Sequence, residues 1–251
     1  VQLALVFDIR PGWHTYWKNP GDSGEPPRIR WRLPEGVSVG PIRWPHPELI
    51  RIGPLANYGY SGRAVHLMDL AVPAGWEAGR ALDLTAEVSW LVCEEHCIPE
   101  GGILKLRLET RARAGPMDPV VAPIFAAARA GLPQVLQGEA MLSSAGAGLT
   151  LGFSTDDLPP DPSHVWFFAG EWGLVEHAAD QPWREQDGRL TLDLTPGSLA
   201  QQVAPDGVLV VEGEAGVAAY SVKPLLDAVA ASDSTALDLP LALGFALLGG
   251  L

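Results

Sequence analysis

Two cysteines, Cys93 and Cys97, are the residues of this sequence with the clearest potential for chemistry. Four steps along an extended strand would cover about 13 Å, whereas the Cα atoms of a disulfide lie roughly 4.4 to 6.8 Å apart. If the two thiols are bonded, Glu94–His96 must therefore form a turn, either at the tip of a hairpin or on one helical turn. A bond that closes so small a loop restricts the unfolded chain little. It is a weak structural crosslink but a suitable redox switch.

The residues alone leave three uses of this pair open. The bond could be structural or redox-active, and a cysteine count does not separate the two. Metal binding is the third use, because His96 lies between the cysteines and His14 and His66 could approach in space; thiolates with imidazole suit Cu(I) or Zn(II). Cys-x3-Cys is not the usual zinc spacing, however. Glu94 and Glu95 disfavour a thiolate beside them, whereas a protonated His96 would favour it.

The residues that flank the pair predict different exposure for the two sulfurs. Cys97 precedes Ile98-Pro99, and proline has no N–H with which to pair in a ladder, so the chain there should lie at an open edge. Cys93 follows the apolar run Trp90–Val92 and should be the more buried sulfur. Cys97 is therefore the expected point of attack.

The composition limits the possible partners. The formal net charge of −13 would repel nucleic acid and anionic membrane surfaces. No basic cluster supplies a footprint for phosphate groups. The sequence therefore predicts a protein partner, with no nucleic acid and no cofactor.

Short strand-like runs broken by proline and glycine fill the sequence up to residue 112. Regular spacing of such runs is typical of an antiparallel β-sandwich. The segment 11–27 is so rich in turn-forming residues that we expect an ordered loop there. The predicted strands are Leu3–Ile9, Arg28–Leu33, Val65–Val72, Ala81–Val92 and Ile103–Thr110.

Between residues 112 and 136 the sequence becomes alanine-rich. Pro123–Ala130 places proline at a helix start, with Gly131 just past its end, which predicts a short helical connector. A second set of strand-like runs follows, separated by turn signals such as Asp187-Gly188. The predicted strands are Leu149–Phe153, Val165–Phe168, Leu190–Leu194, Val208–Glu212 and Ala218–Val222. The expected fold is all-β, with two tandem β-sandwich domains.

The predicted division of the chain has three parts. Residues 1–115 form the domain with the cysteine pair, and residues 116–233 form the second sandwich. Residues 234–251 include the charge-free stretch Leu239–Leu251, which is shorter than the roughly 20 residues that span a bilayer. We expect this stretch to be an apolar tail or the start of a transmembrane helix.

Several long motifs occur in order along the chain. They are Phe7–Arg30 (FDIRPGWHTYWKNPGDSGEPPRIR), Gly40–Trp44 (GPIRW), Tyr58-Gly59, Trp90–Pro99 (WLVCEEHCIP) and Trp166–Gln181 (WFFAGEWGLVEHAADQ). The first four resemble the amino-terminal domain of the DsbD family of protein-disulfide reductases, and more narrowly its branch called suppressor of copper sensitivity protein B. The last resembles a segment of the second exported domain of that branch, and the sequence from Leu239 resembles the entry into the membrane domain.

The resemblance implies an immunoglobulin-like redox domain in the periplasm, attached to the inner membrane in the whole protein. A transmembrane redox domain of the same protein would reduce it, and it would reduce periplasmic thioredoxin-like proteins by thiol-disulfide exchange. Cys97 would form the mixed disulfide and Cys93 would resolve it. A copper-binding or copper-tolerance module that uses Cys93, Cys97 and nearby histidines is the alternative.

In the family, a cap loop that contains an aromatic residue next to a Tyr-Gly pair covers the cysteines. Here that pair is Tyr58-Gly59, and Asn57 stands where the aromatic residue is expected. We therefore expect Tyr58 or Tyr60 to shield the disulfide, with His96 also facing the substrate.

Overall fold

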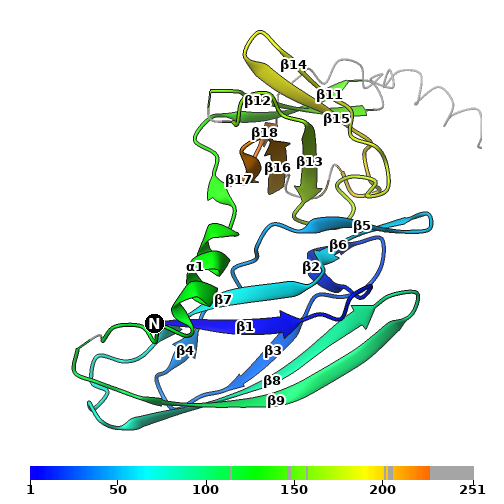
Figure 1. Ribbon diagram of the computed structural model, residues 1–251. Coiled ribbons are helices and arrows are strands. Elements are labelled where there is room, and N and C mark those ends of the chain that lie inside the picture. The colour runs from blue at the N-terminus through cyan, green and yellow to red at the C-terminus, as the bar shows by residue number, and fades with distance from the viewer. Residues whose placement is uncertain (114, 146–147, 157, 201, 203–205, 227–251) are drawn as a thin grey trace, which may run out of the picture.

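The structure, a computed structural model, describes residues 1–113, 115–145, 148–156, 158–200, 202 and 206–226. Nearly all of the regular structure in these residues is β-strand, and the helix is α1 (Ala122–Ala130) (Figure 1). The strands before α1 form one set of sheets, here called the first half, and the strands after α1 form another, the second half. The predicted fold class, all-β with a short helical connector, is confirmed.

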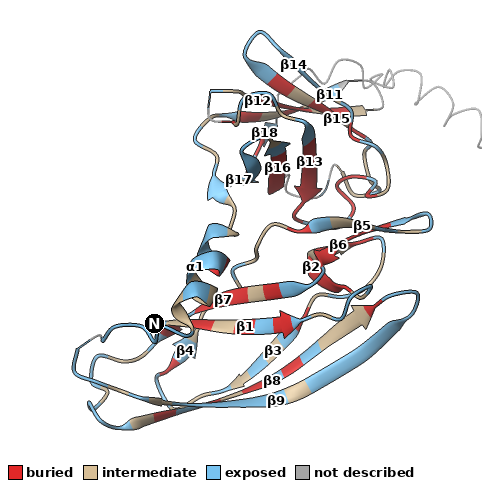
Figure 2. Ribbon diagram, in the orientation of Figure 1, coloured by how far each residue is buried: buried red, intermediate tan, exposed pale blue. Residues whose placement is uncertain are grey.

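The first half consists of three antiparallel sheets of three strands each. Its strands are β1 (Gln2–Asp8), β2 (Thr15–Gly21), β3 (Arg28–Arg32), β4 (Ser38–Val39), β5 (Glu48–Ile52), β6 (Leu55–Tyr60), β7 (Arg63–Ala71), β8 (Ala81–Cys93) and β9 (Cys97–Glu109). The strand orders are β1-β7-β4, β2-β6-β5 and β3-β8-β9. Within β8, Leu82, Leu84 and Val88 are buried and alternate with more exposed residues, as expected when one face of a sheet covers a core. β9 is mostly exposed and lies at the edge of its sheet (Figure 2).

One prediction for the first half is wrong. The segment 11–27, expected to be a loop, contains the strand β2. This strand pairs with β6 through Thr15, Tyr16 and Gly21, and the register shifts between Tyr16 and Gly21. Pro20 lies in the shifted part, where no ladder hydrogen bond requires its missing N–H. The irregular pairing is therefore why a strand can exist in a segment so rich in turn-forming residues.

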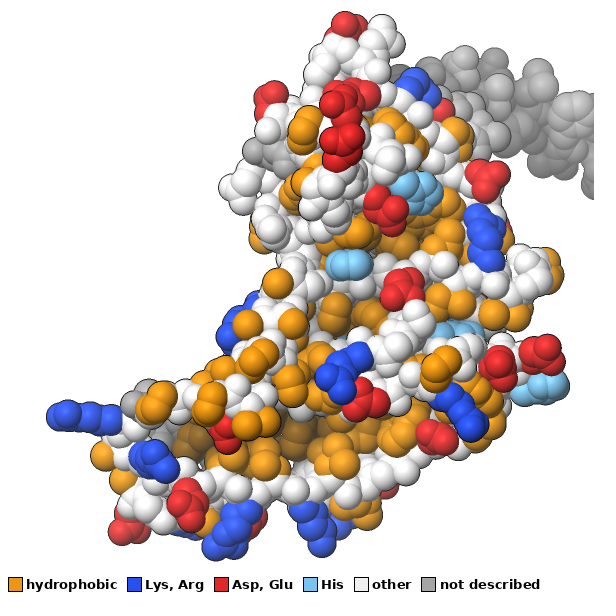
Figure 3. All heavy atoms as spheres, viewed as in Figure 1, with side chains coloured by type: hydrophobic (Ala, Val, Ile, Leu, Met, Phe, Trp, Pro, Cys, Tyr) orange, Lys and Arg blue, Asp and Glu red, His pale blue; other side chains and the backbone are white. Residues whose placement is uncertain are grey.

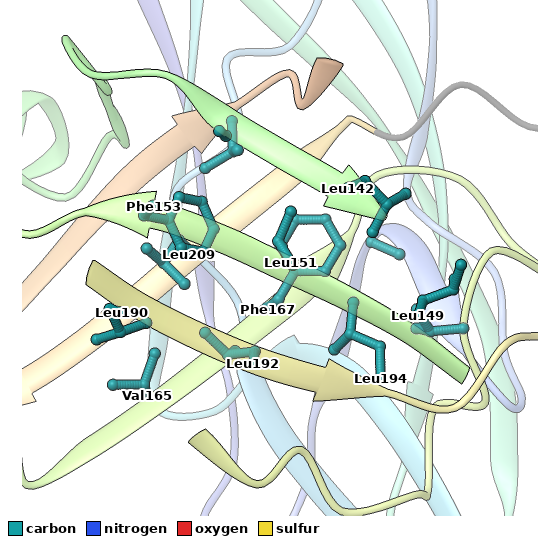
Figure 4. Packing of buried hydrophobic residues seen from close by; sticks show 14 of the residues in the cluster. Leu142, Leu149, Leu151, Phe153, Val165, Phe167, Leu190, Leu192, Leu194 and Leu209 are labelled. Carbon is teal, nitrogen blue, oxygen red and sulfur yellow. The ribbon is translucent and has the colours of Figure 1, made fainter. Parts of the chain in front are cut away.

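The second half is a sandwich of two sheets. Its strands are β10 (Gln134–Val135), β11 (Ala140–Ala145), β12 (Gly148–Ser154), β13 (His164–Ala169), β14 (Trp183–Gln186), β15 (Arg189–Leu194), β16 (Gly207–Gly213), β17 (Gly216–Val222) and β18 (Leu225–Leu226). The four-stranded sheet has the order β10-β17-β16-β13, and the five-stranded sheet has the order β14-β15-β12-β11-β18. Leu151 and Leu192 from the five-stranded sheet pack with Phe167 and Leu209 from the other sheet (Figure 4).

Each predicted strand overlaps an observed one, and the predicted helix Pro123–Ala130 corresponds to α1, with Gly131 immediately after it. No helix in the described part of the chain is both long and apolar enough to cross a bilayer. The stretch Leu239–Leu251 lies outside the described residues. The domain boundaries at 115 and 233 stay a prediction.

The two halves share an apolar interface built from the outer face of the four-stranded sheet. Val165 and Phe167 of β13 face the core of the second half, whereas Trp166 and Phe168 pack with residues of the first half. Because both faces of β13 are covered, its residues from Val165 onward are all buried. An uninterrupted apolar run is the expected sequence pattern for a strand with two covered faces.

Candidate redox-active site

The two cysteines lie at the tip of the hairpin formed by β8 and β9. Cys93 ends β8, Cys97 begins β9, and the two are direct cross-strand partners. They are joined by a disulfide with Cα atoms 4.2 Å apart. Of the two predicted geometries, the hairpin turn over Glu94–His96 is thus confirmed. The site differs from one built at a helix amino terminus.

The two sulfur-bearing residues differ in exposure, as predicted. Cys93 is only 2% exposed, whereas Cys97 is exposed. The backbone of Cys93 is held by a reciprocal pair of hydrogen bonds, in which His14 N donates to Cys93 O at 2.8 Å and Cys93 N donates to His14 O at 3.0 Å. Cys97 lies on the edge strand β9, which has no strand on its outer side among the described residues. An incoming thiolate therefore has access to Cys97.

A tyrosine hydroxyl contacts the exposed sulfur. Tyr16 Oη lies 3.4 Å from Cys97 Sγ, and His14 Nε2 lies 3.3 Å from Tyr16 Oη. Because a disulfide sulfur carries no proton, the Tyr16 hydroxyl must donate in this contact, and His14 can then donate from Nε2 to the tyrosine oxygen. His14, Tyr16 and Cys97 thus form a short hydrogen-bonded chain that ends at sulfur.

The protonation states suit this chain. Burial raises the pKa of Tyr16 above its ordinary value, an effect that the nearby Ser23 hydroxyl opposes. Burial also lowers the pKa of His14. Both side chains are therefore uncharged near pH 7, so the Tyr16 hydroxyl still carries the proton that it shares with sulfur in the hydrogen bond. A hydrogen bond to an ionised sulfur is stronger than one to a neutral sulfur, so the same hydroxyl would stabilise a thiolate at Cys97 after reduction.

The turn after β2 holds the Tyr16 ring in place. Gly24 has a φ of +91°, and a Cβ atom at this position would lie 2.1 Å from Cζ of Tyr16. Glycine is therefore required both by the backbone conformation and by its close approach to the ring. The sequence-based interpretation missed Tyr16 as a site residue. The available signal was His14 and Tyr16 two positions apart, a spacing that puts two side chains on one face of a strand.

The predicted cap residues make contacts with groups other than the two sulfurs. Tyr58 is fully buried, and its ring packs edge-on against Phe168 and His177 of the second half. Tyr60 donates a hydrogen bond from its hydroxyl to Pro45 O at 2.9 Å. The shielding role of Tyr58 and Tyr60 stays a prediction.

The two other predicted site residues also have defined positions. Asn57 is buried, and its Oδ1 accepts hydrogen bonds from Ser23 N at 3.2 Å and Ser23 Oγ at 2.9 Å. It thus ties β6 to the turn that covers Tyr16. His96 is exposed at the hairpin turn, beside Cys97.

The histidines named as candidate metal ligands do not form a ligand set with the cysteines. His66 is fully buried among the rings of Phe7, Trp44 and Tyr60. In the part of the chain that the structure describes, no three His, Cys, Asp or Glu side chains come together as a possible metal site. The copper-binding alternative therefore has no set of ligands among these residues.

Several grooves hollow the first half, among them two that lie along β1 and β9. The larger, of about 860 Å³, lies between β1 and β9 and reaches α1, and Figure 3 shows apolar side chains gathered in this hollow. The smaller, of about 470 Å³, reaches the cysteine hairpin, where Trp13, Val92 and Ile98 line it. Only the smaller groove is bordered by immediate neighbours of the disulfide.

Comparison with known proteins gives one family. Residues 1–108 match the family model described as thiol:disulfide interchange protein DsbD, N-terminal. No curated protein matches the chain. The matched region holds β1 to β8, most of β9 and both cysteines. The first 108 residues are thus similar to the amino-terminal domain of the DsbD family, which has an immunoglobulin-like fold and functions in thiol:disulfide interchange.

Proposed function

We propose that this chain is the periplasmic part of a membrane thiol:disulfide reductase. It accepts electrons from a transmembrane redox domain of the same protein and passes them to periplasmic thioredoxin-like proteins. The match of residues 1–108 and the bonded pair of cysteines support this proposal. Within the DsbD family, the motif Trp166–Gln181 favours the branch called suppressor of copper sensitivity protein B.

The observation that carries the proposal is the asymmetry of the disulfide. Exchange requires one sulfur that a partner can reach and a second that resolves the mixed disulfide. Cys97 is exposed and Cys93 is 2% exposed. A structural crosslink needs no such difference, and its loop here is too small to constrain the unfolded chain strongly.

The reaction begins with both cysteines reduced. The Cys97 thiolate attacks one sulfur of the partner's disulfide, a bond forms between the two proteins, and the partner's other sulfur leaves as a thiolate. The Cys93 thiolate then attacks Cys97 Sγ, which releases the partner's first sulfur and restores the Cys93–Cys97 bond. Two electrons pass to the partner, which becomes a dithiol after taking up two protons.

Trapping of the mixed disulfide tests this assignment. The Cys93→Ala variant should accumulate a covalent complex with a purified thioredoxin-like protein in its disulfide form, seen on a non-reducing gel and dispersed by reductant. The matched Cys97→Ala variant should accumulate far less. Equal trapping by both variants would overturn the roles of the two cysteines. Failure of both variants to form a complex with any periplasmic thioredoxin-like protein would overturn the proposed function.

A further inference from the structure

The strand β2 lies between the disulfide and the second half of the chain. At its beginning, His14 bonds to the backbone of Cys93 and Tyr16 contacts Cys97. The next residues face the second half: Trp17 packs edge-on against Phe168 with ring centroids 6.4 Å apart. A single short segment therefore joins the sulfur contact to the interface between the halves.

The pairing of β2 within its own sheet is incomplete. Its register with β6 shifts between Tyr16 and Gly21, so residues 17–20 have no regular ladder to that strand. A strand segment without a regular ladder needs other contacts to hold its backbone in one position. The structure supplies these contacts from the second half.

The central contact is made by the amide of Asn19, which is 2% exposed. Its Nδ2 donates to Ala169 O at 2.9 Å, and its Oδ1 accepts from Gly21 N at 3.1 Å. Ala169 is the last residue of β13 and is fully buried. A buried amide with both ends bonded is costly to displace, because its groups would be left unsatisfied. Asn19 thus fixes the unpaired part of β2 to the second half.

Two further contacts hold β2 and the turn that follows it to the second half. His177 Nδ1 lies 2.9 Å from Asp22 Oδ1, while Asp22 Oδ2 accepts a hydrogen bond from Ala56 N at 2.8 Å. Lys18 Nζ lies 3.3 Å from Asp206 Oδ2, and both side chains are partly exposed at the rim of the interface. The contacts of β2 and its following turn with the second half therefore include buried groups and a partly exposed ion pair.

We propose that the second half of the chain is a support for the redox site, and that Asn19 is a positioning residue that holds Tyr16 against Cys97. The proposal rests on the thiol:disulfide exchange proposed above for Cys97. It gives the second half a role in that chemistry: the four-stranded sheet fixes β2, and β2 presents the tyrosine hydroxyl to sulfur. Loss of the support weakens the hydrogen bond that stabilises the Cys97 thiolate.

The test measures alkylation of Cys97 by iodoacetamide across pH, in the 251-residue chain with Cys93→Ala so that Cys97 is the single thiol. When Asn19→Ala is added to this background, the alkylation rate at pH 7 should fall by about two- to threefold, and the pH profile of alkylation should move to higher pH. The reason is that a thiolate that loses a hydrogen bond forms less readily. Added His177→Phe, which keeps a ring against Tyr58 but removes the bond to Asp22, should move the profile in the same direction.

Arg51→Ala is the matched control. Arg51 also bonds to the second half, through Ala178 O at 3.1 Å and Asp180 at 3.5 Å, but it belongs to β5, which does not pair with β2. Its substitution should leave the alkylation profile unchanged. An unchanged profile in both Asn19→Ala and His177→Phe, or an equal change in Arg51→Ala, would overturn the positioning role.

The alkylation assay needs no protein partner, so its outcome is separate from that of the trapping experiment. A shifted profile in Asn19→Ala without any trapped complex would support the positioning role and count against the proposed function. A trapped complex together with an unchanged profile would support the proposed function and count against the positioning role. If Asn19→Ala does not fold, His177→Phe, which changes the other side of the interface, decides the question.

Discussion

The hydroxyl of Tyr16 lies 3.4 Å from Sγ of Cys97, although 81 positions separate the two residues in the sequence. The contact brings a proton donor to the exposed sulfur of the pair, on the side of the molecule where β2 meets the cysteine hairpin. His14 extends the chain of hydrogen bonds and also holds the backbone of Cys93. The two sulfurs therefore differ in their surroundings as well as in their exposure.

Substitution of Tyr16 by phenylalanine should slow the reaction of Cys97. In the Cys93→Ala background, Tyr16→Phe should lower the alkylation rate at pH 7 by about threefold, because the thiolate fraction falls while the remaining thiolate becomes somewhat more nucleophilic. Tyr60→Phe is the control, since the Tyr60 hydroxyl donates to Pro45 O. Equal rates for Tyr16→Phe and Tyr60→Phe would show that the Tyr16 hydroxyl does not act on sulfur.

Stability should fall in acid because of His66. Burial lowers the pKa of His66 from 6.5 to about 4, so between these values the unfolded state binds more protons than the folded state. The free energy of unfolding should then rise with pH through this range and level off above it, with a total contribution of about 3 kcal/mol. Measurement of urea unfolding from pH 4 to pH 7 checks the slope.

A variant isolates the His66 contribution. His66→Phe should flatten the pH dependence of unfolding, because a phenylalanine in the same ring cluster takes up no proton. His96→Gln serves as the control and should keep the wild-type slope, since the His96 side chain is exposed to solvent in the folded protein. The same slope in His66→Phe and wild type would assign the acid sensitivity to other groups.

Tyr58 should contribute to stability mainly through packing between the two halves. Its ring is fully buried against Phe168 and His177, so Tyr58→Ala should lower the free energy of unfolding by about 3 to 5 kcal/mol, the usual cost of deleting a buried ring. Tyr58→Phe keeps the ring and should retain most of the stability. If Tyr58 also shields the disulfide, folded Tyr58→Ala should react faster with dithiothreitol than Tyr58→Phe does. Equal rates would remove the shielding role from Tyr58.

Ile98 should contribute to binding of the partner and not to the reactivity of the disulfide. A protein bonded to Cys97 Sγ must cover the next residue, and Ile98 is 45% exposed beside the smaller groove. Ile98→Ser should slow exchange with a thioredoxin-like partner by up to about tenfold, while reduction by dithiothreitol stays at the wild-type rate. Ile103→Ser is the control on the same strand, at a side chain that is 66% exposed. A similar loss in Ile103→Ser would indicate a general surface effect.

The sequence by itself determined those features that depend on neighbours along the chain. Three residues between Cys93 and Cys97 require a turn if the thiols are bonded, and the alternating run Ala81–Val92 predicts a strand on its amino-terminal side. Proline at position 123 and glycine at position 131 mark the connector helix. Each of these inferences rests on steric and hydrogen-bonding preferences of a few consecutive residues, which operate before any tertiary contact forms.

Only the tertiary structure decided which side chain reaches the sulfur and what supports it. Tyr16 lies in a segment whose prolines and glycines predict a loop, and it becomes part of a strand because distant residues of β6 pair with it. Asn19 bonds to Ala169, 150 positions away. Contacts over such separations depend on how the sheets and the two halves pack together. Apolar burial over the whole chain sets that packing, and this burial does not depend on how far apart two residues lie in the sequence.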